Sequence, residues 1–225
     1  MRRVWLSLAL GAAVLTLVGT VAAAVASSQT GPRYPGGSII GAPGAGSGSG
    51  MMGGGMMNGG RGMIWLAGNG TRITSIAAAR AWGATAAAGL GLRPGEVIWF
   101  DDGFYVELKD AAGASATEVL VDPASGAVST EPGPAMIWNT RYGMHYPAAD
   151  IAATVSAEQA GRLADGWLSA NRPGRRAEAP DAYPGYYTLE FTRGGTVDGM
   201  LSINAATGQV WYHSWHGRFL AREDG

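Results

Sequence analysis

The feature that most constrains this chain is an internal repeat. Residues 74–128 match residues 156–210, so both ends of the matched segment are offset by 82 positions. A unit of roughly 75 residues buries too little surface to be very stable by itself. We therefore expect two copies of one small fold that share an interface.

Each copy of the repeat opens with a helical pattern. In the second copy, Ser156 and Gln159 have the spacing of a capping box, in which each side chain accepts a bond from the other's backbone N–H. The apolar residues that follow recur on one helical face. They are Ala160, Leu163, Ala164, Trp167 and Leu168, with Ala78, Ala81, Trp82 and Ala86 at matching places in the first copy.

Strands are predicted after each helix. Residues 104–109 and 187–192 alternate apolar and polar side chains, which is the period of a half-buried strand. These two segments are offset by 83 positions, and a shift inside a strand would turn its apolar face outward, so the insertion must lie in a loop. The next strands end in matching turns at residues 122–126 and 204–208.

The repeat therefore predicts an α+β fold of two tandem units, each with one helix packed on a small antiparallel sheet. We divide the chain into a hydrophobic N-terminal helix at 1–27, a flexible linker at 28–70, and repeats at 71–146 and 147–225. The linker consists mainly of Gly, Ser, Pro and Ala, which cannot bury enough apolar surface to order it.

The N-terminus predicts export. Arg2 and Arg3 precede an uncharged and mostly apolar run from residue 4 to residue 26, which is long enough to cross a bilayer as a helix. The next basic residue is Arg33, an asymmetry that places the remainder outside the cytoplasm. The triplet 24–26 is typical of a signal-peptide cleavage site, so both a cleaved signal peptide and a retained membrane anchor remain open.

The linker carries a group of methionines set among glycines: Met51, Met52, Met56, Met57 and Met63. Thioethers are soft ligands that suit Cu(I) rather than Zn²⁺, Mg²⁺ or Ca²⁺. One interpretation is therefore a Cu(I) site. The alternatives are low-complexity sequence in which methionine is tolerated, or an apolar strip that packs on the domain or on the membrane. No other cofactor is expected.

Several function classes are disfavoured. The chain has no cysteine, which excludes disulfides, thiolate metal sites and a cysteine nucleophile. Its formal net charge is −1 and it has no basic stretch, so no nucleic-acid partner is expected. The sequence contains no Gly-x-Ser-x-Gly, Ser-x-x-Lys, His-Glu-x-x-His or P-loop motif. We expect a protein that is not an enzyme.

Residues 200–211, which read MLSINAATGQVW, resemble the PepSY domain, as do the helix and the tyrosine-containing hairpin before them. This domain is found in propeptides of thermolysin-like proteases and in many bacterial envelope proteins. Residues 131–139 and 211–217 are similar to an uncharacterised bacterial group in which a Met/Gly-rich leader precedes two such units. The resemblance covers residues 73–220. It implies an extracytoplasmic, non-catalytic module, with protease inhibition proposed for the wider family.

Two sets of side chains are candidate sites. The first is aromatic and amide-rich and would bind a peptide or ligand: Trp138, Asn139, Tyr142, Trp211 and Trp215. The second is His213 with His216, a pair that could bind a metal ion with a third ligand from His145 or Glu223. Alternatively, these large side chains seal the junction between the repeats, in which case Trp138 and Trp215 should be largely buried there.

We therefore expect a binding or regulatory module of the cell envelope, membrane-anchored or secreted. Its partner would be a peptide, a protease or another envelope protein, and the membrane if the N-terminal helix is retained. The alternative is copper handling in the envelope through the methionine-rich linker.

Overall fold

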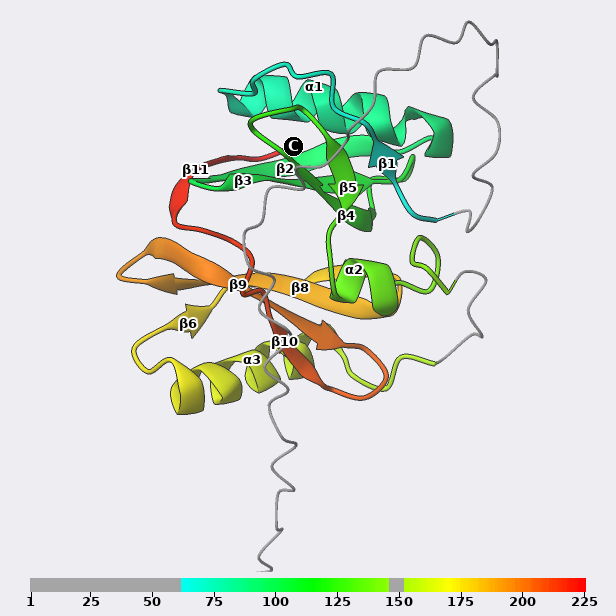
Figure 1. Cartoon of the computed structure of the whole chain (residues 1–225). Helices are drawn as coiled ribbons and strands as arrows, with labels where there is room; N and C mark the ends of the chain where they lie inside the picture. The colour runs from blue at the N-terminus through cyan, green and yellow to red at the C-terminus, as the bar shows by residue number, and fades with distance from the viewer. Residues whose placement is uncertain (1–61, 146–151) are drawn as a thin grey trace, which may run out of the picture. The chain divides into compact units, whose positions relative to one another are not determined.

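The computed structural model describes residues 62–145 and 152–225 (Figure 1). The predicted hydrophobic helix at 1–27, and the methionines of the linker other than Met63, lie outside these residues. Among the residues described, no helix is long and apolar enough to span a membrane. The expected α+β class with antiparallel sheets is confirmed.

The first sheet has six strands in the order β1-β5-β4-β3-β2-β11, and each neighbouring pair is antiparallel. Its elements are β1 (Trp65–Leu66), α1 (Ile76–Ala87), the 3₁₀ turn η1 (Ala88–Leu90), β2 (Arg93–Phe100), β3 (Gly103–Lys109), β4 (Ser115–Val121), β5 (Val128–Thr130) and β11 (Phe219–Glu223). A short helix, α2 (Pro134–Ile137), follows β5.

The second sheet has the order β10-β9-β8-β6, and β7 also pairs with β8. Its elements are α3 (Ala157–Asn171), β6 (Arg176–Ala177), β7 (Asp181–Tyr183), β8 (Tyr186–Arg193), β9 (Thr196–Asn204) and β10 (Val210–Tyr212). The order β10-β9-β8 corresponds to β5-β4-β3 of the first sheet. The predicted capping box at Ser156 and Gln159 begins α3.

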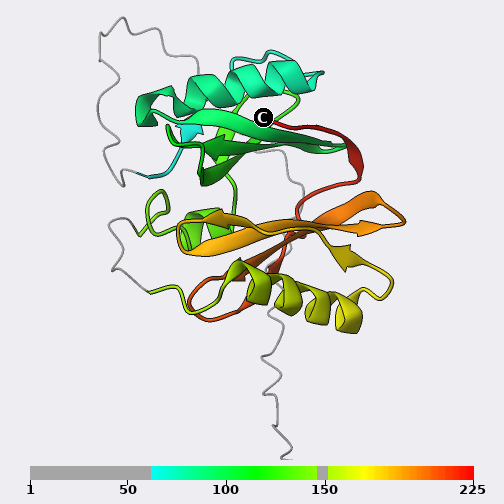
Figure 2. The same cartoon turned by 180° about the vertical axis from the view of Figure 1, so that it is seen from behind.

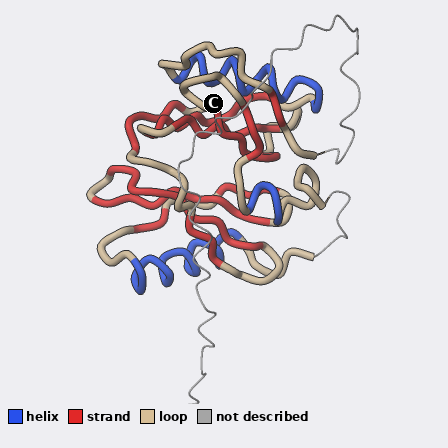
Figure 3. Tube along the Cα trace, viewed as in Figure 1, coloured by secondary structure: helices blue, strands red, loops and turns tan. Residues whose placement is uncertain are grey.

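The two longer helices, α1 and α3, each cover one face of their own sheet (Figures 1 and 2). Small residues let α1 approach closely, since a Cβ added at Gly83 would lie 3.1 Å from Cγ1 of Val106. Under α3, Ala160, Ala164 and Leu168 are buried against Leu189 and Leu201, whereas Leu163 of the predicted stripe is exposed. Figure 3 shows the strands of both sheets lying between α1 and α3.

The sheet faces turned away from the helices pack on each other. Met200 of β9 lies in one apolar cluster with Ile98 and Phe100 of β2. The hydroxyls of Tyr105 on β3 and Tyr183 on β7 are 3.0 Å apart. Two sheets that are each covered on one side by a helix thus bury their remaining faces against one another.

The strand limits differ from the expected divisions at two places. The linker was predicted to extend to residue 70, yet β1 lies within it, because Ile64 is buried and its backbone N–H donates to the Thr130 hydroxyl at 2.8 Å. The last strand, β11, belongs to the predicted second repeat but pairs with β2 of the first sheet. Both short strands cover edges of that sheet that would otherwise expose unpaired backbone groups.

The predicted turns of the repeat have the same local geometry. Gly126 and Gly208 both have φ of +72°, in the left-handed region. The amide of Gly126 donates to the Asp122 carbonyl at 2.9 Å, and that of Gly208 donates to the Asn204 carbonyl at 2.9 Å. The side chains of Asp122 and Asn204 each accept two further backbone bonds inside the turn.

Because these turns require positive φ, Gly126→Ala and Gly208→Ala should each lower the free energy of unfolding by about 1–2 kcal/mol. Gly126→Ala should cost more, since its Cβ would lie 3.1 Å from the Trp82 ring, whereas Gly208 faces the exposed side chain of Leu163. Gly166→Ala, in open space on α3, is the control and should be neutral or stabilising. Urea unfolding that shows no loss for either turn variant would contradict this account.

Candidate functional site

Two positions related by the offset of the predicted repeat meet between the sheets. Glu131 directly follows β5, and its backbone N–H donates to the Glu118 carbonyl at 2.9 Å. His213 directly follows β10, and its N–H donates to the Met200 carbonyl at 3.1 Å. Residues 131 and 213 are offset by 82 positions, as are 118 and 200. The same local backbone arrangement therefore places both side chains at the junction.

The Glu131 carboxylate is the centre of a buried cluster that also contains His213, Trp215 and His216. Its Oε1 accepts a hydrogen bond from Trp215 Nε1 at 3.0 Å. The same oxygen lies 2.8 Å from Nε2 of His216 and 3.4 Å from Nδ1 of His213. The side chains of Glu131 and His213 are fully buried.

Neighbouring residues fix the orientation of the two imidazoles. Nε2 of His213 lies 2.9 Å from the Ser202 hydroxyl, which is itself 2.9 Å from the Thr188 hydroxyl. The Trp215 ring stacks on His213, with a centroid distance of 4.6 Å. Phe100 stacks on His216 at 4.4 Å. Each imidazole is therefore held by an aromatic ring that stacks on it.

Several polar atoms of this cluster have no hydrogen bond of acceptable geometry. Among the described residues, the buried side-chain atoms without a partner are Arg80 Nε, Thr117 Oγ1, Glu131 Oε2, His213 Nδ1 and His216 Nε2. The last three converge within the cluster. Leaving a buried polar atom unpaired costs about 1–3 kcal/mol, so their convergence calls for a physical explanation.

The charges in the cluster follow from burial and proximity. Burial acts to raise the pKa of Glu131, but His213 and His216 outweigh it and hold that pKa below its usual range. Burial lowers the pKa of His213, and Glu131 opposes this only in part. The Glu131 carboxylate and the two imidazoles therefore influence one another's protonation.

A second buried carboxyl group, Glu118, bonds to tyrosines from both sheets. Tyr186 donates to its Oε2 at 2.7 Å, and Tyr105 donates to its Oε1 at 3.0 Å. Burial raises the pKa of Glu118 well above its usual value, and the charge of Glu131 raises it further. Both effects favour the protonated form of Glu118, which would connect β4 to β8 without a buried charge.

A pocket of about 510 Å³ borders the cluster through Trp215 and His216. Its lining residues are Trp65, Asp102, Gly103, Phe104, Leu120, Val121, Asp122, Ser125, Ala127, Ser129, Trp215 and His216. The Trp65 side chain is 73% exposed, which is unusual for tryptophan. The pocket thus combines accessible aromatic surface with two acidic residues.

The predicted aromatic and amide residues lie in different surroundings. Trp138 and Trp211 meet edge to face with their centroids 5.5 Å apart, and Trp138 and Trp215 are both partly buried. Asn139 is buried and donates to the Ala116 carbonyl at 2.8 Å. Tyr142 is part of the core of the first sheet. Within this set, only Trp215 lines the pocket.

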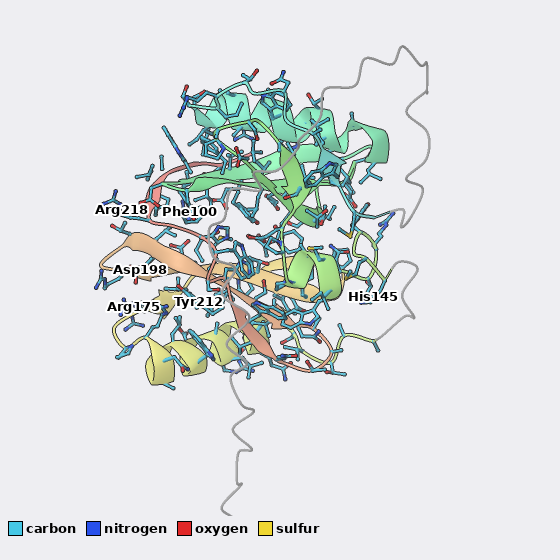
Figure 4. All side chains as sticks on the ribbon, in the orientation of Figure 1. Phe100, His145, Arg175, Asp198, Tyr212 and Arg218 are labelled. Carbon is cyan, nitrogen blue, oxygen red and sulfur yellow. The ribbon has the colours of Figure 1, made fainter. Side chains whose placement is uncertain are left out.

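The structure corrects the expected third ligand of the histidine pair. Glu223 bonds to Arg80 at 3.2 Å instead. His145 is exposed and lies across the molecule from Phe100, the residue that stacks on His216 (Figure 4). Glu131 is the acidic group that faces both His213 and His216. Of the predicted thioether ligands, Met63 is described and is 41% exposed, while Met51, Met52, Met56 and Met57 lie outside the described residues.

Sequence reasoning did not select Glu131, Glu118, Tyr105 or Tyr186. The 82-residue offset relates Glu131 to His213, and that relation was a usable signal. No equivalent signal marked Glu118, because an acidic residue in an alternating strand is normally assigned to the solvent face.

No family model matches the chain, and no curated protein matches it. Among solved structures, a match is found to the C-terminal domain of Bacillus megaterium YpeB, with 12% sequence identity and a TM-score of 0.35. The match covers 66% of this chain and 71% of that chain. A TM-score this low is too weak to support any inference about fold or function.

The raised pKa of Glu118 predicts how stability depends on pH. Its contribution is complete below the unfolded-state pKa, near 4.5, and is lost as pH rises through the folded-state pKa. The Glu118→Gln variant keeps the shape of the side chain but cannot ionise, so its stability relative to wild type should rise as the pH increases above about 5, by at most about 1.4 kcal/mol per pH unit.

The control for this measurement is Glu158→Gln, since that carboxylate is exposed and pairs with Arg162 on the surface of α3. Its stability relative to wild type should not change with pH. Urea unfolding of both variants across this pH range measures the difference. If the free energy of unfolding of Glu118→Gln differed from that of wild type by the same amount at every pH, Glu118 would be ionised in the folded protein.

Proposed function

We propose that this protein is a non-catalytic binding module of the cell envelope that modulates a peptidase or another extracytoplasmic protein. In this proposal its two halves are copies of one PepSY-like unit. The matched turns at Gly126 and Gly208 support the duplication, as do the equivalent backbone bonds made by Glu131 and His213. The N-terminal sequence supports export, either as a released or as an anchored protein.

The observation that carries the binding role is the pocket beside the junction. Its volume of about 510 Å³ lies within the range of sites that accept a small ligand or a few side chains. Trp65, Leu120 and Trp215 supply apolar surface, and Asp102 and Asp122 supply negative charge. This chemistry suits a peptide segment that carries an apolar side chain next to a lysine or arginine.

Selection of a displayed peptide library on the full chain should enrich such sequences. Ala127→Arg places a long cationic side chain in the pocket and should weaken binding of the enriched peptides at least about tenfold, through steric exclusion and charge. Fluorescence polarisation with synthetic peptides measures the affinity.

The matched control is Ala170→Arg, the same substitution at an exposed position of α3 in the other half of the molecule. It should leave peptide affinity unchanged. If no sequence is enriched, or if both arginine variants bind equally well, the pocket is not the binding site.

Copper handling through the linker is the second proposal, and it rests on the five methionines together with the exposure of Met63. A peptide of residues 48–66 should bind one Cu(I) in competition with a chelator, because three thioethers suffice for this soft ion. Replacing Met52, Met56 and Met57 by Leu retains the apolar bulk and should abolish binding. Equal copper retention by both peptides would exclude the thioethers as ligands.

A further inference from the structure

We propose that Glu131, His213 and His216 form a binding site for one divalent transition-metal ion, with Zn²⁺ as the favoured ion. Each residue offers one ligand atom, and these atoms all lie within 4.8 Å of one another. The carboxylate comes from the end of the first half, and the two imidazoles come from the segment after β10. A bound ion would therefore link the two halves of the molecule.

The separations of the ligand atoms fit such an ion. Two ligand atoms at about 2.0 Å from a tetrahedral Zn²⁺ lie roughly 3.3 Å apart. The Glu131 oxygen lies 3.4 Å from His213 Nδ1 and 2.8 Å from His216 Nε2. Both Glu131 separations are within about half an ångström of this value, and the two imidazole nitrogens, which lie within 4.8 Å of each other, would move to coordination distance as the ion binds.

The cluster contains atoms that can donate an electron pair to a metal ion and that make no hydrogen bond within the protein. Glu131 Oε2, His213 Nδ1 and His216 Nε2 are all buried and have no hydrogen bond of acceptable geometry. A metal ion bound through Glu131 Oε1 would accept electron pairs from both imidazole nitrogens at once. The ion would thus satisfy the two unpaired imidazole nitrogens of the cluster.

The residues around the ligands also fit. Metal-binding histidines commonly donate their second ring N–H to a nearby acceptor, which fixes the tautomer. A hydrogen bond donated by His213 Nε2 to the Ser202 hydroxyl, 2.9 Å away, would leave the lone pair of Nδ1 available to the ion. The Trp215 indole donates to the Glu131 carboxylate at 3.0 Å and orients it.

The donor set selects among ions. Two imidazoles and one carboxylate suit Zn²⁺ and its neighbours, whereas Mg²⁺ and Ca²⁺ prefer oxygen ligands only. Cu(I) favours sulfur, so this site is distinct from the thioethers of the linker. Zn²⁺ takes four ligands, and His216 and Trp215 border the pocket, from which water could provide the fourth.

The test uses the full chain, purified in detergent, stripped with a chelator and reloaded with Zn²⁺. After dialysis, elemental analysis should find one zinc per chain. Glu131→Gln and His216→Gln should each weaken Zn²⁺ binding at least about tenfold in competition with a chromogenic chelator. His145→Gln removes the exposed histidine outside the cluster and should bind like wild type, as should replacement of the linker methionines by leucine.

X-ray absorption of the zinc-loaded wild type tests the ligands even if the variants fail to fold. It should show two imidazoles, oxygen and no sulfur. Three outcomes would overturn the proposal: no zinc retained by the wild type, equal affinity in the wild type and in folded Glu131→Gln and His216→Gln, or sulfur among the ligands. In the first case, the contact between His216 and Glu131 is a metal-free pair.

Discussion

The structure depends on a buried carboxylate at the junction of its two sheets. An ionised carboxylate cannot stay out of water without compensating partners, and removing one such partner typically costs several kcal/mol. Glu131 finds its partners in the segment after β10, where Trp215 donates at 3.0 Å and His216 lies at 2.8 Å. The end of the first half therefore requires the end of the second. This requirement explains why the two sheets bury their open faces against each other.

Other contacts at the junction also connect the two sheets. Glu118 accepts bonds from Tyr105 of one sheet and Tyr186 of the other, and its raised pKa contrasts with the lowered pKa of Glu131. At the periphery, Arg222 of β11 bonds to Glu178 at 3.0 Å and lies 3.4 Å from Glu190, while its own strand pairs with β2. The chain thus returns to the first sheet only after passing through the junction. The pocket borders this closing segment at Trp215 and His216, and the unpaired atoms His213 Nδ1 and His216 Nε2 belong to it.

Much of the local structure could be predicted from the sequence, since local rules determine it. The capping box at Ser156, the alternation at 104–109 and the Gly126 and Gly208 turns all depend on neighbouring residues. Contacts between segments that are distant in the sequence could not be predicted in the same way. Nothing in the sequence of β11 indicates that it pairs with β2. Likewise, nothing in the proline-rich stretch around Glu131 indicates that His213 and His216 lie beside it. Pairing across more than eighty residues depends on how the sheets pack, and sequence periodicity does not describe that packing.

Native-state hydrogen exchange tests most directly whether the junction makes one cooperative unit of the two halves. Amides of β3 and β4 in the first sheet should open with the same free energy, and the same urea dependence, as amides of β8 and β9 in the second. That equality is expected because Glu131 and Glu118 lose their partners when either sheet unfolds. Two separate free energies, with one sheet remaining protected while the other exchanges, would contradict the account.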